Sequence, residues 1–184
     1  MKVLITPEMR EAAKNEALKR DKFIRHHFEV GHLSPMERDV VGFLGEFARV
    51  SLIKTDWKAN IRENYFTIDD YDVVINELKI DIKTETVPRI SALKIIDKTI
   101  HDNELYGRRL INKNQLAFLD KYDWIFFGLF IREEMDYWYP IGIIDTKTII
   151  RDYPATIFRP DGKRYPFPGS PIPTSILQDY KTLI

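Results

Sequence analysis

Two short runs near the middle of the chain are rich in β-branched side chains, and in the second run Ile80 and Ile82 alternate with polar residues. This pattern predicts strands at residues 71–75 and 79–84. The polar residues Asn76 and Glu77 separate the two runs and favour a tight turn. The two strands are therefore predicted to form a hairpin.

The register of this hairpin decides which side chains meet. A turn of two residues places Asp72 directly opposite Asp81. Because side chains alternate between faces along a strand, Lys83 lies on the same face as Asp81, while Ile80 and Ile82 point the other way. The hairpin thus gathers two carboxylates and one ammonium group.

A strong helix start precedes the hairpin. Ser34 and Glu37 are spaced as a capping box, with Pro35 at the first helical position. Apolar residues then repeat at helical spacing and form one face of the helix: Val40, Phe43, Leu44, Phe47 and Val50.

Glu46 lies beside this apolar face, close to Gly42 and Gly45. Since glycine lowers helix stability, the two glycines suggest that another backbone approaches the helix closely. Two interpretations of Glu46 stay open. It is either an acidic member of a functional site or a solvated glutamate that pairs with Arg49.

Further segments complete the expected order of elements. A helix is expected to begin at Thr6-Pro7 within residues 1–30, and a strand of uncertain ends within residues 52–70. The nearly continuous apolar residues 124–131 predict a central strand buried on both faces. Residues 137–144 follow it as the second strand of a hairpin.

Residues 86–122 are expected to be largely helical, with a helix at 115–119, and carry seven basic and four acidic residues directly after the Lys83 strand. Side chains of this kind contact phosphates and sugars. The alternative, that these charges are merely solvated, stays open. The candidate nucleic-acid contacts are Arg89, Arg108, Arg109, Lys113 and Gln115.

The last part of the chain, from Tyr153 onward, contains six of the ten prolines and several aromatic residues. This composition predicts an irregular tail that wraps the core, with a turn at Asp161-Gly162 and a short helix near Pro173. Residues 1–184 are expected to form a single domain with its core at about residues 35–145.

Composition narrows the class of protein. With 44 % hydrophobic and 30 % charged residues and no long apolar run, the chain is typical of a soluble protein without a membrane partner. Cysteine is absent, which excludes disulfides and thiolate metal sites, and no signal-peptide pattern is present; a cytoplasmic location fits best. A net charge of zero disfavours nucleic-acid binding through overall charge but allows a local basic face.

The paired carboxylates suggest a specific chemistry. Two carboxylates that face each other repel unless a cation lies between them. Mg²⁺ prefers carboxylate oxygens, lowers the pKa of its bound water and neutralises charge on a phosphodiester. A nearby lysine can orient that water or help to deprotonate it. Asp72, Asp81 and Lys83 therefore suit phosphodiester cleavage.

Asp72 followed by Asp81-Ile82-Lys83 resembles the motif of the PD-(D/E)XK, or restriction-endonuclease-like, nuclease superfamily, with Tyr71 in place of the motif's proline. Gly45-Glu46-Phe47-Ala48 is similar to the helical segment that offers an acidic residue to the metal site in that family. The resemblance implies metal binding by Asp72, Asp81, the Ile82 carbonyl and Glu46.

The order of elements predicts an α/β domain with a central mixed β-sheet flanked by helices, in agreement with the restriction-endonuclease-like fold that the resemblance implies. Asp70 shares a strand face with Asp72 and is a second candidate ligand. Some members of the superfamily carry a glutamine in a helix after the lysine strand, with a tyrosine four residues later. Gln115 has Leu119 at that later position.

The first functional hypothesis is a deoxyribonuclease, as an endonuclease, that uses Mg²⁺ or Mn²⁺ to cleave DNA. The alternatives are a nuclease-fold module that binds nucleic acid or a protein without cutting, and a protein in which these charges form a surface salt-bridge network. Many nucleases that cut both strands act as dimers, so a homodimer stays open.

Overall fold

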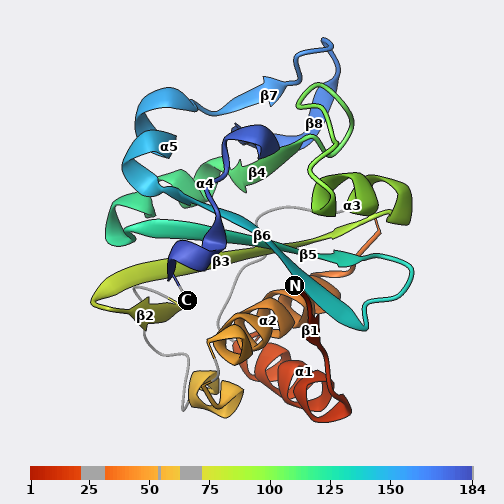
Figure 1. Cartoon of the computed structure of the whole chain (residues 1–184), viewed down its shortest axis with the longest axis vertical. Helices are drawn as coiled ribbons and strands as arrows, with labels where there is room; N and C mark the ends of the chain where they lie inside the picture. Colours follow the sequence, from red (N-terminus) through yellow and green to blue (C-terminus); the bar gives the residue numbers. More distant parts are fainter. Residues whose placement is uncertain (22–31, 54, 63–71, 184) are drawn as a thin grey trace.

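The computed structural model describes residues 1–21, 32–53, 55–62 and 72–183 of the chain. These residues form a mixed α/β structure in which a curled, mixed sheet separates two layers (Figure 1). The sheet has five strands in the order β1 (Val3–Leu4), β6 (Tyr137–Asp145), β5 (Trp124–Ile131), β3 (Leu78–Val87) and β2 (Val73–Ile75). The prediction of a mixed sheet flanked by helices is confirmed.

The central strand is β5, which pairs parallel to β3 and antiparallel to β6. Every residue of β5 after Trp124 is buried, because its apolar sequence supplies side chains to both faces of the sheet. The predicted central strand and the hairpin that follows it are therefore confirmed.

One face of the sheet is covered by α1 (Pro7–Asp21) and α2 (Pro35–Leu52). Both begin where proline and capping residues predict, and Ser34 and Glu37 form the complete capping box. The short strand β1 was not predicted. The part of the expected first helix at residues 22–30 lies outside the described residues.

The strand expected within residues 52–70 does not occur in the described part of this segment. The helix α2 continues to Leu52, and a 3₁₀ helix follows at Trp57–Asn60. Residues 63–70, together with Tyr71 of the predicted hairpin, lie outside the described residues.

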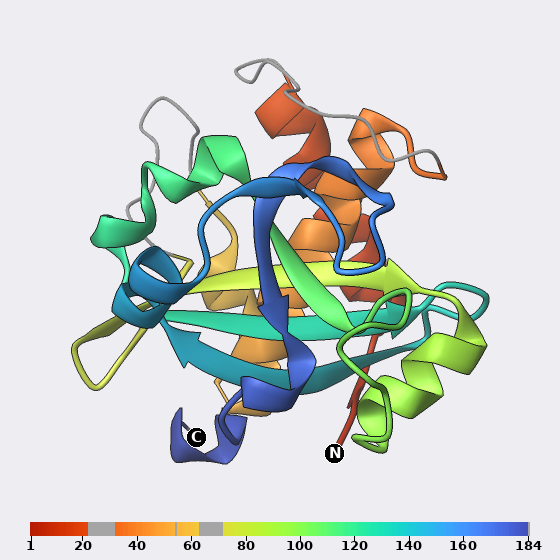
Figure 2. The same cartoon turned by 90° about the horizontal axis from the view of Figure 1, so that it is seen from above.

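The opposite face of the large sheet is covered by a second, three-stranded sheet, seen from above in Figure 2. Its strands are, in order, β4 (Arg108–Asn112), β8 (Arg164–Pro173) and β7 (Thr156–Phe158). The expected irregular tail is thus wrong for Thr156–Phe158 and Arg164–Pro173, which are strands. The expected turn at Asp161-Gly162 is confirmed, and the short helix near Pro173 is the 3₁₀ helix Thr174–Ile176. The tail completes the core, because Ile172 of β8 packs with Ile111 of β4 and Ile125 of β5.

The expectation of a largely helical segment at residues 86–122 is correct only in part. Its α-helices are α3 (Arg89–Ile96) and the short α4 (Lys113–Leu116), and the strand β4 lies between them. The helix expected at 115–119 is therefore shifted: α4 ends at Leu116, and a 3₁₀ helix follows at Leu119–Lys121. The last helix is α5 (Thr146–Asp152), after β6. Across the described ranges, no helix is both long and apolar enough to cross a membrane.

Candidate active site

The hairpin of β2 and β3 has the predicted register. Ile75 pairs with Leu78 and Val73 with Ile80. Asn76 and Glu77 both adopt left-handed backbone conformations, with φ of 49° and 68°. Positive φ at both central residues is the geometry of a two-residue hairpin turn that matches the twist of its strands.

Asp72 lies just beyond the end of β2, where the two strands separate. Its backbone N–H donates to the Ile80 carbonyl at 3.1 Å, and its carboxylate Oδ2 accepts from the Ile82 N–H at 2.7 Å. The side chain therefore bonds to the strand edge that β2 leaves unpaired. This contact holds the Asp72 carboxylate beside Asp81, whose pKa it raises.

Asp81 is 5 % exposed, and Lys83 compensates its charge. The Lys83 Nζ donates to Oδ1 at 2.9 Å and lies 2.7 Å from Oδ2. Burial raises the pKa of Asp81 to about 6, the Lys83 ammonium opposes that rise, and Asp72 adds to it. Asp81 thus sits between one cation and one competing carboxylate.

Lys83 remains an ammonium group in this environment. Burial alone would lower its pKa, but the Asp81 and Asp72 carboxylates outweigh burial and raise the pKa above its usual value. A charged lysine donates hydrogen bonds and does not accept a proton. In this arrangement Lys83 can orient a water molecule or stabilise negative charge.

Glu46 projects from α2 and is 5 % exposed. Asn60 Nδ2 donates to its Oε2 at 3.0 Å, and Arg62 Nη2 does so at 3.3 Å. Burial, followed by repulsion from Asp72, raises the pKa of Glu46 to about 8. Pairing with Arg49 does not occur, because the Arg49 guanidinium donates to the Leu183 carbonyl at 2.9 Å.

The glycines of α2 have different surroundings. A Cβ on Gly45 would overlap the Thr84 side chain of β3, whereas a Cβ on Gly42 would meet no atom within 4 Å. The close approach expected at both glycines thus occurs at Gly45 only, and a side chain rather than a backbone makes it. Because Gly45 has no side chain, α2 lies close to β3, and the charge of Asp72 is near enough to raise the pKa of Glu46.

Arg62 is the member of the cluster that sequence reasoning missed. Its Nη2 lies 3.3 Å from Glu46 Oε2 and 3.4 Å from Asp72 Oδ1, so one guanidinium joins the helix carboxylate to the hairpin carboxylate. The arginine belongs to no periodic segment. The one available signal is that buried carboxylates require a cation.

The donor atoms of the hairpin fit a hard divalent cation. Asp81 Oδ2 is buried and lies 2.7 Å from the Lys83 ammonium, so one cation already faces this oxygen. The N–H and C=O of a strand residue point to the same side, so the Ile82 carbonyl faces the edge at which its N–H binds Asp72. Oxygen donors of this kind are what Mg²⁺ and Mn²⁺ prefer.

The wider ligand set is less complete. Among the described residues, no three histidine, aspartate or glutamate side chains are grouped closely enough to hold a metal ion. Glu46 contacts Asp72 through Arg62 rather than directly. The second candidate ligand, Asp70, lies outside the described residues.

The candidate nucleic-acid contacts are dispersed. Arg89, at the start of α3, pairs with Glu134, and Arg108 donates to the carbonyls of Asp102 and Pro171. Arg109 is 1 % exposed and pairs with Glu85, so its position is structural and does not offer a surface contact.

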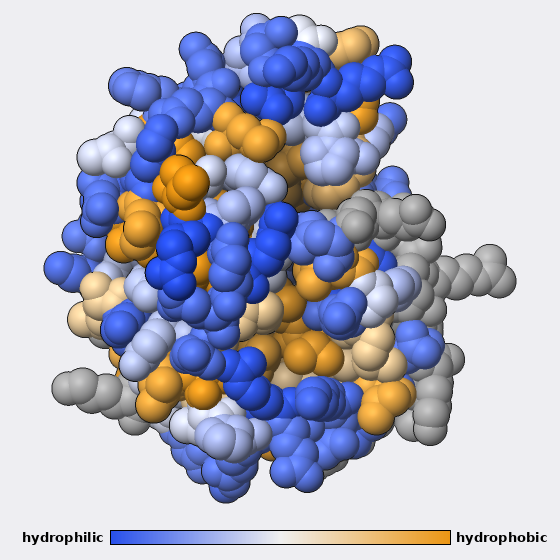
Figure 3. Space-filling model, turned by 90° about the vertical axis from the view of Figure 1, so that its right-hand side faces the viewer, coloured by the Kyte–Doolittle hydropathy of each residue, from blue (hydrophilic) through white to orange (hydrophobic). Residues whose placement is uncertain are grey.

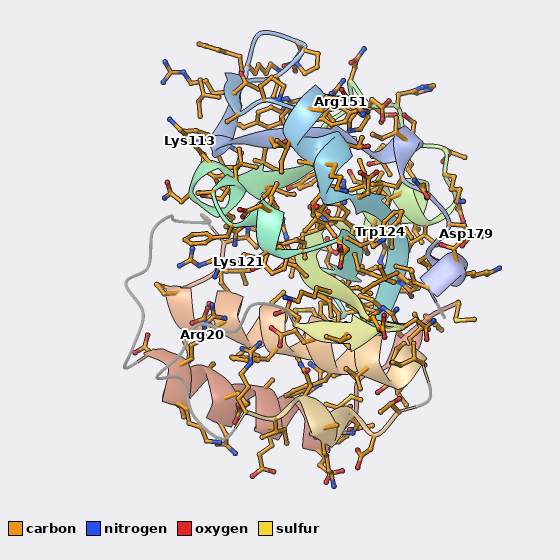
Figure 4. All side chains as sticks on the ribbon, turned by 90° about the vertical axis from the view of Figure 1, so that its left-hand side faces the viewer. Arg20, Lys113, Lys121, Trp124, Arg151 and Asp179 are labelled. Atoms are coloured by element: carbon orange, nitrogen blue, oxygen red, sulfur yellow. The ribbon has the colours of Figure 1, made fainter. Side chains whose placement is uncertain are left out.

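Lys113 and Gln115 lie on α4, where Lys113 is exposed and Gln115 half-buried. Figure 4 shows Lys113, Lys121 and Arg20 along the same side of the molecule. They come from α4, from the 3₁₀ helix Leu119–Lys121 and from α1. Arg20 is close enough to Glu46 to oppose the rise of its pKa.

This arrangement joins two carboxylates and an ammonium group on one hairpin to a helical carboxylate through an arginine. Comparison of the chain with protein-family models, with curated proteins and with solved structures found no match.

Proposed function

We propose that this protein is a divalent-metal-dependent nuclease that hydrolyses phosphodiester bonds in DNA, with a restriction-endonuclease-like arrangement of its sheet and helices. The observation that carries the proposal is the hairpin end, where Asp72 lies beside the buried Asp81–Lys83 pair. Two carboxylates and a lysine in a partly buried position are suited to metal-assisted hydrolysis.

In this proposal, Asp72, Asp81 and the Ile82 carbonyl hold Mg²⁺ or Mn²⁺, and Glu46 supports them from α2. Such an ion would supply a water molecule of lowered pKa and neutralise charge on the phosphate. Lys83 would orient that water and stabilise negative charge. Its raised pKa supports this role over that of a general base.

The choice of DNA as substrate is supported by basic side chains, of which Lys113 and Lys121 are exposed and Arg20 is half-buried. Arg20, Lys113 and Lys121 lie along one side of the molecule in Figure 4, and Arg20 is near Glu46. Phosphate contacts of this kind position a nucleic-acid backbone without reading its sequence. The proposal therefore gives the protein endonuclease activity without assigning it a recognition sequence.

The experiment that tests the proposal is a cleavage assay on supercoiled, linear and single-stranded DNA. The reaction contains Mg²⁺ or Mn²⁺, with EDTA in a parallel reaction. We expect metal-dependent cleavage by the wild-type protein and a loss of at least about 100-fold in Asp81→Asn and in Lys83→Ala.

The matched controls remove a charge of the same sign outside the cluster. Asp136→Asn affects an exposed carboxylate that pairs with Arg10, and Lys94→Ala affects an exposed lysine that pairs with Glu104. Both controls should retain cleavage. Cleavage that persists in Asp81→Asn, or that EDTA leaves unchanged, would refute the catalytic assignment.

A module that binds nucleic acid without cutting is the second candidate. It is favoured by Arg62, which already compensates Glu46 and Asp72 in the described structure. This candidate predicts DNA binding of equal affinity in Mg²⁺ and in EDTA, with no cleavage of any substrate. A gel-shift titration under both conditions separates the two functions.

A further inference from the structure

A second polar site lies in the layer formed by the three-stranded sheet. It is separate from the carboxylate cluster, by which we mean Glu46, Asp72 and Asp81 with their cations Arg62 and Lys83. A pocket separates the loop before β4 from the β7–β8 hairpin, on the side of the molecule that faces the viewer in Figure 3. The residues that matter in its lining are Tyr106, Arg108, Arg159, Arg164 and Tyr165.

The arginines of the pocket carry positive charge that is only partly compensated. Arg159 pairs with Asp161 at 3.0 Å. Arg108 donates to two backbone carbonyls, which leaves its charge intact, and Arg164 lies over the ring of Phe158 at 5.7 Å. Among the described residues, no carboxylate forms an ion pair with Arg108 or Arg164.

The acidic residues that also line the pocket are bound to other partners. Asp102 accepts from the N–H and the hydroxyl of Ser175, at 3.2 Å and 2.5 Å. Glu104 forms an ion pair with Lys94 at 2.6 Å and accepts from the His101 N–H. The Lys94 ammonium compensates Glu104, whereas Asp102 keeps its charge because both of its donors are neutral. Arg108, Arg159 and Arg164 outnumber Asp102 and Asp161, so the pocket still offers positive charge to a ligand.

The walls of the pocket supply aromatic and apolar surface. Tyr165 is half-buried and lines the pocket with Arg108 and Arg159; burial raises the pKa of its hydroxyl, and the charges of these two arginines oppose that rise. Tyr106 and the exposed Leu105 also line the pocket, and Tyr106 is held from behind, because it packs against the core cluster around Val87 and its hydroxyl accepts from Arg132 at 3.1 Å. Hydrophobic residues appear between hydrophilic ones in the upper part of this face in Figure 3.

The loop that carries Tyr106 is held in place by several contacts. Gly107 lies so close to His101 that a Cβ there would overlap its carbonyl. The Gly107 carbonyl accepts from the N–H and the hydroxyl of Thr174, at 3.0 Å and 2.6 Å. Arg109 also donates to the Tyr106 carbonyl. A preformed loop lowers the entropic cost of binding a ligand.

We propose that this pocket binds a nucleotide, with its phosphate on the arginines and its base against the tyrosine and leucine side chains. Arginine binds phosphate through charge-assisted hydrogen bonds, and base stacking on aromatic rings is tolerant of sequence. The nucleotide is either free in solution or part of a nucleic-acid strand. The inference does not depend on cleavage at the carboxylate cluster.

The test measures binding in EDTA, where metal-dependent cleavage cannot occur. The probes are adenosine monophosphate, by calorimetry, and a fluorescein-labelled single-stranded oligonucleotide of ten nucleotides, by anisotropy. Arg164→Ala and Arg159→Ala each remove a pocket guanidinium. We expect each variant to weaken binding roughly tenfold, the effect of a hydrogen bond to a charged group.

The matched control is Arg151→Ala, which removes the same charge from an exposed arginine that pairs with its neighbour Asp152. It should bind as the wild-type protein does. Comparable affinity for both probes indicates a site for free nucleotide, and much tighter oligonucleotide binding indicates a strand. Lack of binding of either probe, or equal weakening in Arg151→Ala and Arg164→Ala, would overturn the proposal.

The two proposals of function can fail separately. Loss of cleavage in Asp81→Asn with pocket binding intact would support both. Binding of either probe that depends on Arg164, in a protein that never cleaves DNA, would leave the pocket established and refute the nuclease. Cleavage without any pocket binding would do the reverse.

Discussion

Burial raises the free-energy cost of each charged side chain at the end of the β2–β3 hairpin. Asp81 is nearly inaccessible, and its neighbour Asp72 adds a second negative charge. The Lys83 ammonium compensates both carboxylate charges, and its side chain is only 25 % exposed. A buried ion pair of this kind adds little net stability, but removal of one partner alone is costly.

The Asp81–Lys83 pair leads to the first prediction. Lys83→Met should lower the free energy of unfolding by about 1–3 kcal/mol, less than for a fully buried pair because Lys83 is partly exposed. Asp81→Asn combined with Lys83→Met should cost less than the sum of the two single variants. Urea denaturation in EDTA at pH 8 measures all three. Additive effects would show that the pair is not coupled.

Glu46 leads to a prediction about pH. Its pKa in the folded protein is about 8, above the usual 4.5, so the folded state binds the proton more tightly than the unfolded state. The stability from this group is complete below about pH 4.5 and is lost as pH rises through 8. Without metal, we expect the unfolding free energy to fall by about 2–4 kcal/mol between pH 5 and 8.

Thermal unfolding in EDTA across this pH range measures the effect, with Glu46→Gln as the variant that cannot ionise. Glu46→Gln should flatten the profile above pH 6, whereas the raised pKa of Asp81, about 6, should leave a smaller slope below it. Parallel profiles for the two proteins would mean that Glu46 keeps an ordinary pKa in the fold.

At the scale of elements, the sequence predicted those features that depend on residues close together in the chain, such as helix starts and hairpin registers. The capping box at Ser34 fixed the start of α2, and the Asn76-Glu77 turn fixed the register of β2 and β3. The strand β4 escaped prediction because its partner β8 is distant in the chain and rich in proline. Pairing between distant segments leaves no periodic signal in either segment.

In the candidate site, too, local patterns were predicted and contacts between distant segments were not. Asp72, Asp81 and Lys83 were found because the alternation of a single hairpin places them together. Arg62 was not found because its role depends on how α2 and the hairpin meet in space. Arg109 was predicted as a surface contact and is buried, since the β4 strand that turns it inward was not predicted.

The packing of α2 on β3 leads to a prediction with a built-in control. Gly45→Ala would force the Thr84 side chain and α2 apart, so we expect a loss of about 1–3 kcal/mol in stability. Gly42→Ala meets open space and should stabilise the helix by up to about 1 kcal/mol. Chemical denaturation of both variants tests this, and equal effects would contradict the close approach at Gly45.

At the scale of the whole molecule, the strands β7 and β8 help to cover the second face of the large sheet, so hydrophobic core lies on both faces of that sheet. The buried Arg109 of β4 pairs with Glu85 of β3 and thereby links the second sheet to the strand that carries Asp81 and Lys83. The pocket proposed to bind a nucleotide and the carboxylate cluster therefore share one framework. Ligand binding at either site should stabilise the same folded state.

Metal binding gives the prediction that tests this framework as a whole. If Asp72 and Asp81 hold Mg²⁺, saturation at about 100 times the dissociation constant adds about 2.7 kcal/mol to the stability of the fold. For a chain of 184 residues this corresponds to a rise of roughly 5–10 °C in the unfolding temperature. The rise should be larger at pH 8 than at pH 5.5, because Asp81, with a pKa of about 6, is protonated at the lower pH.

The measurement is a Mg²⁺ titration followed by thermal unfolding, on wild-type protein, Asp81→Asn and Asp136→Asn. Asp81→Asn removes a ligand oxygen and should abolish the shift, whereas Asp136→Asn changes an exposed carboxylate on another loop and should keep it. An equal shift in all three proteins would place Mg²⁺ elsewhere on the surface. The carboxylate cluster would then be a structural charge network, which Arg62 and Lys83 already compensate.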